Sequence, residues 1–338
     1  MDNPCGLTGL AFVEFAAPTT EGLDELQRLF AALGFSKVGV HREREVLHYR
    51  QKEIHFLVNR DPETFAGQFA RRHGPCVASM GWEFADPDMA IDEATERGAE
   101  AYEGETIFGY PAVVGIGGSL IHLIPDGGRS WLDRFLRLDA PELVPARGFT
   151  TIDHLTNNVE KGTLEHWTRF YIDIFGFAPV RHFDIRGEKT GLQSDALRSP
   201  CGSFCIPINE GTEESSQIEE YLREYGGPGI QHIALASDDL LASLEGLEVP
   251  TLDIDDEYYE SVFERVPNVS EDHEAIARAQ VLVDGDEEGY LLQIFTRNVI
   301  GPIFFEMIQR KNHQSFGEGN FGALFRSIER DQERRGVL

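Results

Sequence analysis

The sequence predicts an α+β protein made of two copies of one βαβββ module. The chain has 338 residues, 41% of them hydrophobic, which is enough for two domains with cores of their own. The order of strand and helix signals in residues 1–147 recurs in residues 148–338, and the first helix of each half ends at a Gly-Phe pair, Gly34-Phe35 or Gly176-Phe177. A repeat of this length indicates duplicated structural units, so we expect a domain boundary near residue 147.

The first module begins with an extended run over residues 10–15. A helix follows, in which Leu and Phe recur every three or four residues until Gly34. Residues 125–147 are rich in Gly, Pro, Asp and Leu and are interpreted as a linker. The other elements expected in this half are strands at 38–41, 45–49, 54–58, 78–84, 112–115 and 120–124 and a helix at 87–98.

Three chemically active side chains lie in apolar, strand-like runs of the second half. They are His154 in IDHLT, His232 in IQHIA and Glu306 in FFEMI. A carboxylate among apolar residues needs a cation nearby, because an unpaired buried charge is costly. Two imidazoles and one carboxylate on successive strands make the facial triad that binds non-haem Fe(II) and leaves coordination positions open. The alternatives are a salt bridge from Glu306 to Arg310 or Lys311, and two ordinary core histidines.

The first half lacks this set of residues. Superposing the Gly-Phe pairs and the flanking motifs gives three pairs of equivalent positions: Phe12 and His154, Ser79 and His232, His122 and Glu306. Only His122 among the three first-half residues could bind a metal. We therefore expect residues 1–147 to be a metal-free structural module and residues 148–338 to carry the catalytic site.

The composition argues against several kinds of partner. The formal net charge is −28, so nucleic acids and anionic membrane surfaces would be repelled. Lysine occurs at only five positions, which suits a salt-rich cytoplasm or an ordinary acidic enzyme. No apolar run reaches the length of a membrane span, and the first twenty residues lack a signal-peptide pattern, so we expect a cytoplasmic protein. The four scattered cysteines are expected to be free thiols.

Seven motifs of the second half occur in the order of one known family. They are DHLTNNV, SPCGSFCIPINE, SQIEEYL, GGPGIQHIAL, GYLLQIFT, FFEMIQR and FGEGNFGALFRSIERDQERRG. With them, the chain resembles the 4-hydroxyphenylpyruvate dioxygenases of bacteria and archaea, within the vicinal-oxygen-chelate superfamily. The resemblance implies two half-open barrels and a C-terminal lid helix. It also implies an Fe(II) enzyme of tyrosine catabolism that converts 4-hydroxyphenylpyruvate and O2 to homogentisate and CO2, assembled as a homo-oligomer, either a tetramer or a dimer.

The same resemblance assigns roles to individual residues. Polar side chains would hold a neutral phenol without adding a charge to an apolar pocket, and phenylalanines would stack on the ring and exclude water. The implied metal ligands are His154, His232 and Glu306; the implied catalytic residues are Ser194, Asn209, Gln231 and Gln293; and the implied substrate-binding residues are Pro207, Gln217, Phe295, Phe304, Phe316 and Phe321.

The last part of the chain predicts an amphipathic helix at about residues 320–335. Asn320 is a suitable N-cap, and Phe321 begins an apolar face at helical spacing, while polar residues such as Glu329 are expected to face solvent. Three glycines at 317, 319 and 322 would give the preceding loop the freedom of a hinge. We expect this helix both to complete the core and to act as a lid.

Three alternative functions share some of these features. A 4-hydroxymandelate synthase would use the same fold, ligands and substrate; the Pro-x-Asn motif at Pro207 and Asn209, together with Phe321, favours the dioxygenase. An extradiol ring-cleaving enzyme would not need the aromatic lid and the glutamines. A catalytically inactive paralogue that only binds an aromatic acid would be expected to lose one of the three metal ligands.

Overall fold

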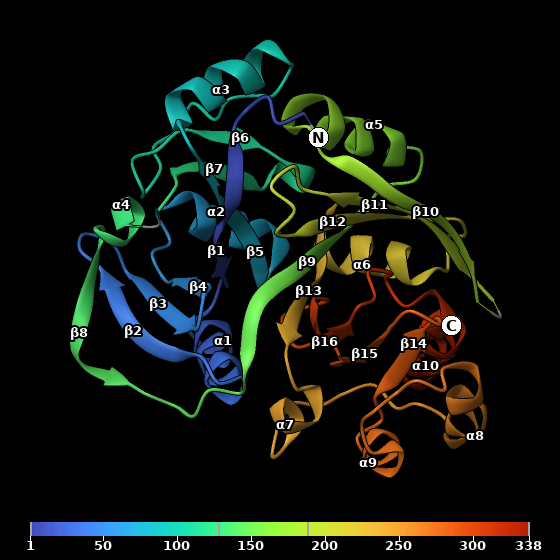
Figure 1. Ribbon diagram of the computed structural model, residues 1–338. Coiled ribbons are helices and arrows are strands. Elements are labelled where there is room, and N and C mark those ends of the chain that lie inside the picture. The colour runs from blue at the N-terminus through green and yellow to red at the C-terminus, as the bar shows by residue number, and fades with distance from the viewer. Residues whose placement is uncertain (1, 128, 188, 337–338) are drawn as a thin grey trace.

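The computed structural model describes residues 2–127, 129–187 and 189–336 of the chain. Its first half forms one curled eight-stranded sheet (Figure 1). The strands are β1 (Leu7–Ala16), β2 (Ser36–His41), β3 (Val46–Gln51), β4 (Ile54–Asn59), β5 (Cys76–Phe84), β6 (Ala112–Val114), β7 (Leu120–Pro125) and β8 (Phe135–Glu142). The helices are α1 (Thr20–Ala32), α2 (Phe65–His73), α3 (Pro87–Glu96), the short 3-10 turn η1 (Ile116–Gly118) and α4 (Arg129–Leu132).

The second half forms another curled eight-stranded sheet beside the first (Figure 1). Its strands are β9 (Phe149–Val159), β10 (Ala178–Arg186), β11 (Gly191–Arg198), β12 (Cys205–Gly211), β13 (Gly229–Ser237), β14 (Leu282–Gly285), β15 (Tyr290–Phe295) and β16 (Phe304–Lys311). Its helices are α5 (Leu164–Arg169), the π-helical turn η2 (Phe170–Ile174), α6 (Gln217–Tyr225), α7 (Leu240–Leu244), α8 (Asp256–Arg265), α9 (His273–Arg278), the 3-10 turn η3 (Glu318–Asn320) and α10 (Phe321–Arg335).

The two sheets share one topology apart from one edge strand each, β8 in the first and β14 in the second. Their strand orders are β6-β7-β5-β1-β4-β3-β2-β8 and β10-β11-β12-β9-β13-β16-β15-β14. In each half the first strand runs parallel to the fourth and antiparallel to the fifth, so β1, β4 and β5 correspond to β9, β12 and β13. The predicted fold class, an α+β protein with duplicated half-barrels and a C-terminal helix, is therefore confirmed.

Aromatic side chains fill the centre of the first sheet. Gly81 of β5 pairs with Phe12 of β1 and with His122 of β7. A Cβ atom on Gly81 would lie only 2.3 Å from Cε1 of Phe12, so this ring rests directly on the glycine. Phe108 and Trp131 pack around the same ring, with centroid separations of 4.5 and 5.0 Å. The space that a metal centre would need at this position is occupied by side chains.

The two halves pack through the opposite faces of their sheets. One hydrophobic cluster of buried residues contains side chains from both halves. At its centre, Trp82 of β5 contacts Phe175, Phe177 and Phe204 of the second half, with ring centroids 5.2 to 5.6 Å apart. A shared core of this kind fixes the two half-barrels relative to each other, since burial of large aromatic rings dominates such contacts.

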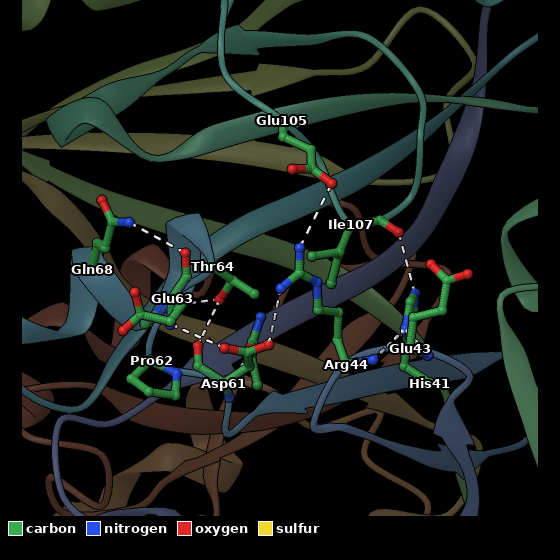
Figure 2. A network of polar contacts seen from close by, with 12 residues as sticks. His41, Glu43, Arg44, Asp61, Pro62, Glu63, Thr64, Gln68, Glu105 and Ile107 are labelled. Atoms are coloured by element: carbon green, nitrogen blue, oxygen red, sulfur yellow. Dashed lines mark hydrogen bonds and ion pairs between the residues drawn. The ribbon is translucent and has the colours of Figure 1, made fainter.

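A network of polar contacts links the end of β2 with loops of the first half (Figure 2). His41 accepts hydrogen bonds at Nδ1 from the backbone N–H groups two and three residues later, so its Nε2 donates to the carbonyl oxygen of Ile107, 3.2 Å away. Arg44 lies between Asp61 and Glu105, at 3.5 and 3.6 Å. These contacts join three loops of the first half.

Several elements differ from the sequence-based expectation. The segment interpreted as a linker contains α4 and β8, and β8 adds an edge strand to β2. The first helix of the second half changes from α-helical to π-helical geometry at Phe170. Glu329 of α10 is buried rather than exposed, because its carboxylate accepts hydrogen bonds from the loop at Thr190. Among the described residues, no helix has the length and apolar composition needed to cross a bilayer.

Candidate active site

Three adjacent strands position the predicted triad. Ala234 of β13 pairs with His154 of β9 on one side and with Glu306 of β16 on the other. His232 precedes Ala234 by two residues, so its side chain points to the same face of the sheet. The small Ala234 side chain leaves the space between the three larger residues open.

The donor atoms of the triad converge. His154 Nε2 lies 3.0 Å from Glu306 Oε2 and 3.3 Å from His232 Nε2, and His232 Nε2 lies 3.4 Å from Glu306 Oε2. Ligand atoms on adjacent corners of an octahedron, with metal–ligand distances of about 2.1 Å, are about 3 Å apart. Among the described residues, this is the only group of three or more His, Cys, Asp and Glu side chains with ligand atoms within 4.8 Å of one another. The spacing and the donor chemistry fit a facial Fe(II) site.

Outer contacts hold both imidazoles in the orientation that a metal requires. His154 Nδ1 lies 2.8 Å from Asp153 Oδ2, and His232 Nδ1 lies 3.1 Å from Gln231 Oε1. Because both partners are acceptors, each Nδ1 carries the proton and each Nε2 is left as a ligand atom. Arg310 in turn holds Asp153 through two hydrogen bonds of 2.7 and 2.8 Å.

The electrostatics of the site favour a cation between the three donors. Burial raises the pKa of Glu306, but the two histidines outweigh burial and bring that pKa down to about 2. Burial lowers the pKa of His154, but Glu306 and Asp153 raise it to about 9. Burial lowers the pKa of His232. The ionised carboxylate is thus compensated by a proton on His154, a position that a metal cation would take over.

Neither sequence-based alternative is present. Arg310 binds Asp153 rather than Glu306, and the Lys311 ammonium lies 4.0 Å from Glu271. The two histidines contact Glu306 and each other instead of serving as isolated core residues.

One cavity above the triad contains every residue to which the resemblance assigns a role. Its polar lining is concentrated on β11, β12, β13 and β15 and at the start of α6. Its aromatic lining comes from β10, β15, β16, the loop after β16 and α10. The predicted residues that line it are His154, Ser194, Pro207, Asn209, Gln217, Gln231, His232, Gln293, Phe295, Phe304, Glu306, Phe316 and Phe321.

Aromatic rings surround the His154, His232 and Glu306 triad. Phe304 stacks on His232 with a centroid separation of 4.8 Å and an interplanar angle of 20°. Phe316 meets His154 edge-on, 5.5 Å away. Phe321 contributes the first residue of α10 to the same wall. A site enclosed in this way strengthens electrostatic interactions, because water is largely excluded.

Several residues of the site were not predicted from the sequence. Thr156 Oγ1 lies 3.0 Å from His232 Nε2, and its position two residues after His154 could have indicated a shared face of the strand. Asp153 could have been suspected as a carboxylate beside a candidate metal ligand. The remaining lining residues are Phe183, Ile185, Leu192, Leu324, Phe325 and Ile328.

Known proteins resemble the chain over its full length. The family model described as "Hydroxyphenylpyruvate dioxygenase, HPPD, N-terminal" matches residues 1–131, and that of the "Glyoxalase/Bleomycin resistance protein/Dioxygenase superfamily" matches residues 151–257. The 4-hydroxyphenylpyruvate dioxygenase of Legionella pneumophila is 43% identical, over 100% of this chain and 98% of its own. This chain belongs to the 4-hydroxyphenylpyruvate dioxygenase family.

Membership of this family fixes the class of chemistry. The protein is a non-haem iron dioxygenase, and its cofactor is Fe(II). Two further proteins with other names are also similar to the chain. Protein MelA of Shewanella colwelliana is 53% identical, over 99% of each chain. The solved structure of a triple mutant of 4-hydroxymandelate synthase from Streptomyces coelicolor has a TM-score of 0.82 and 27% identity, and the match covers 96% of this chain and 99% of that one.

Proposed function

We propose that this protein converts 4-hydroxyphenylpyruvate and O2 to homogentisate and CO2, with Fe(II) held by His154, His232 and Glu306. The combination of a converging triad with a cavity lined by phenylalanines and uncharged amides supports this reaction. In the overall balance, the substrate carboxyl group leaves as CO2; one oxygen atom of O2 enters the ring and the other completes the new carboxylate.

The charge of the cavity explains how an acidic protein would bind an anionic substrate. The described residues that line the cavity include no lysine or arginine, so once a metal has replaced the proton on His154 the lining offers the substrate carboxylate no cationic side chain. Fe(II), when bound, supplies a Lewis acid for the carboxylate and keto oxygens of the substrate and a binding position for O2. The side chains of the cavity are left to orient the ring and to exclude water.

The amides around His232 are arranged to hold a neutral hydroxyl group. Gln231 Oε1 accepts from His232 Nδ1, at 3.1 Å, and from Asn209 Nδ2, at 3.4 Å. Asn209 Nδ2 also donates to Asn158 Oδ1, 3.3 Å away. These bonds use neither Gln231 Nε2 nor Asn209 Oδ1. A phenol can therefore accept from the first and donate to the second, without a buried charge.

The two halves of the chain would have different roles. We assign the catalytic centre and its lid helix to residues 148–338 and a structural role to residues 1–147. Phe12, at the position equivalent to His154, supports this division, because its ring fills the centre of the first sheet. We also propose a cytoplasmic homo-oligomer, a tetramer or a dimer, whose mass light scattering of the purified protein would measure.

Product identification tests the proposed reaction. The protein is loaded with Fe(II) without oxygen, O2 and 4-hydroxyphenylpyruvate are admitted, and the aromatic product is identified by chromatography and mass spectrometry. We expect homogentisate. We expect Glu306→Ala to form no product and Glu287→Ala, which removes an exposed carboxylate elsewhere, to behave as the wild type.

A different product would favour the second candidate function. Formation of 4-hydroxymandelate would be consistent with the triad as the metal site, but it would contradict the interpretation that Asn209 and Phe321 favour the dioxygenase. The similarity to the solved structure of 4-hydroxymandelate synthase makes this the first alternative product to look for. An iron-loaded protein that forms no product would contradict the proposed substrate.

A further inference from the structure

Asn320 occupies the N-cap position of α10, but its side chain does not cap the helix. No hydrogen bond joins this side chain to the first turn of α10, and the backbone at Asn320 already has helical φ and ψ values of −97° and −14°. The residue is completely buried. A buried amide must satisfy its polar atoms elsewhere.

The Asn320 side chain connects the cavity residue Gln293 to the outside of the second half-barrel. Its Nδ2 lies 3.3 Å from Gln293 Oε1. Its Oδ1 lies 2.7 Å from the hydroxyl group of Tyr258 and 3.4 Å from Arg265 Nη2. Arg265 is itself fixed by Asp284, whose Oδ1 lies 2.6 Å from Arg265 Nη1.

The chemistry of Arg265 determines which end of each amide faces which neighbour. A guanidinium group only donates hydrogen bonds, so the Asn320 atom beside it must be the oxygen. The Asn320 nitrogen therefore faces Gln293, and because this nitrogen only donates, the Gln293 atom beside it must also be the oxygen.

Tyr258 is compatible with the same assignment. Its hydroxyl oxygen accepts from the backbone N–H of Val283. The single phenolic proton has two acceptors within reach, Asn320 Oδ1 at 2.7 Å and the Val283 carbonyl oxygen at 2.8 Å, so the assignment rests on Arg265.

The loop before α10 covers the oxygen of Gln293 from a second direction. A Cβ atom on Gly317 would lie 1.9 Å from Gln293 Oε1, so the backbone of this loop rests on the amide. Gly317 has φ +80°, a conformation that suits glycine. With Oε1 engaged by Asn320 and covered by Gly317, Nε2 is the end of the Gln293 amide left for the cavity that Gln293 lines.

We propose that Arg265 and Asn320 are positioning residues that orient Gln293 so that it donates N–H to an oxygen atom of the bound ligand. Because Asn320 immediately precedes α10, the Gln293 amide has this orientation only when the N-terminal end of α10 is packed against the second half-barrel. The identity of the ligand, an aromatic 2-oxo acid, rests on the proposed function; the orientation of the amide does not.

Asn320→Asp tests this proposal with little change in shape. The new carboxylate still accepts from Tyr258 and Arg265 but no longer donates, so Gln293 must turn and offer it Nε2, which leaves Oε1 facing the ligand. We expect the Kd of the Fe(II)-loaded protein for 4-hydroxyphenylpyruvate, measured by calorimetry without oxygen, to rise at least about tenfold. Circular dichroism should show a folded variant whose free energy of unfolding is lower than that of the wild type, because the new carboxylate is buried and shares Arg265 with Asp284.

A matched control and a ligand-free readout complete the experiment. Asn268→Asp adds the same charge at an exposed position and should bind 4-hydroxyphenylpyruvate as the wild type does. The side-chain N–H2 resonance of Gln293, assigned by its loss in Gln293→Glu, should shift in Asn320→Asp. A Kd within twofold of the wild type would overturn the proposal. If the wild type does not bind 4-hydroxyphenylpyruvate, the proposed function is wrong. The orientation of the Gln293 amide is then tested by the resonance alone, and an unchanged resonance in Asn320→Asp would contradict it.

Discussion

Replacing Arg310 by methionine should destabilise the metal-free protein by about 3 kcal/mol. Arg310 holds Asp153 through two hydrogen bonds of 2.7 and 2.8 Å, and both side chains are only 17% exposed. Removal of one partner from a buried ion pair costs roughly 3–5 kcal/mol, because the other charge is left uncompensated. The remaining exposure favours the lower end of that range. In a chain of 338 residues, about 3 kcal/mol corresponds to a decrease of roughly 4 °C in Tm.

Urea unfolding in the presence of a chelator measures this effect without a contribution from metal loss. Arg186→Met, at an exposed ion pair, is the matched control and should cost less than about 1 kcal/mol. The double variant Arg310→Met, Asp153→Asn should recover part of the loss, since it removes the stranded charge. If Arg310→Met costs no more than Arg186→Met, or if the double variant recovers nothing, the reasoning is refuted.

The same substitution should weaken metal binding. Asp153 orients His154, and Arg310 holds Asp153. Loss of an outer partner such as Asp153 itself typically lowers metal affinity roughly 10- to 100-fold, so the indirect effect of Arg310→Met should lie at or below the lower end of that range. Competition with a chelator of known Fe(II) affinity measures this change. An unaltered affinity would show that His154 keeps its orientation without Arg310.

Three other perturbations should give defined outcomes. Burial raises the pKa of Glu14 in the folded state. The stability that the protonated Glu14 contributes is complete below the pKa that this group has in the unfolded state, and it is lost as the pH rises through the pKa in the folded state. The stability of Glu14→Gln relative to the wild type should therefore increase from about pH 4 upward, by about 1.4 kcal/mol for each unit of pKa displacement, and a constant difference in unfolding free energy would contradict this. With a net charge of −28, the protein should become more stable from low to molar KCl, and a flat or falling unfolding curve would refute adaptation to salt. Truncation after Asn320 should abolish turnover while circular dichroism still shows most of the fold, and surviving turnover would exclude a lid role for α10.

Much of the site could be predicted because its residues lie in strands with a clear apolar context. The two histidines and Glu306 interrupt apolar runs, which makes them conspicuous in the sequence. The distances between them depend on strand register, which a single sequence does not specify. Ala234, which lies between His154 and Glu306 across two strand pairs, is an ordinary apolar residue in the sequence and acquires its importance only from that register.

The elements that escaped prediction lack an apolar period or depend on distant partners. β8 is mostly exposed and exists as a strand because it pairs with the edge of β2. Glu329 has the exposed character of a helix surface in the sequence, yet a loop far away in the chain covers it. Asn320 has the residue type and position of an N-cap, and tertiary contacts with Gln293, Tyr258 and Arg265 divert its side chain.

The packing of Phe12 on Gly81 restricts the order in which the first half could change during evolution. A side chain at position 81, such as the alanine found at the equivalent position in the second half, would collide with the ring unless Phe12 had first been replaced by a smaller residue. Introduction of a metal ligand at Ser79, beside the existing His122, would likewise bring no benefit while the ring remains. A metal centre in the first half therefore requires that Phe12 is replaced first, and replacement by a smaller residue removes core volume before any new function appears.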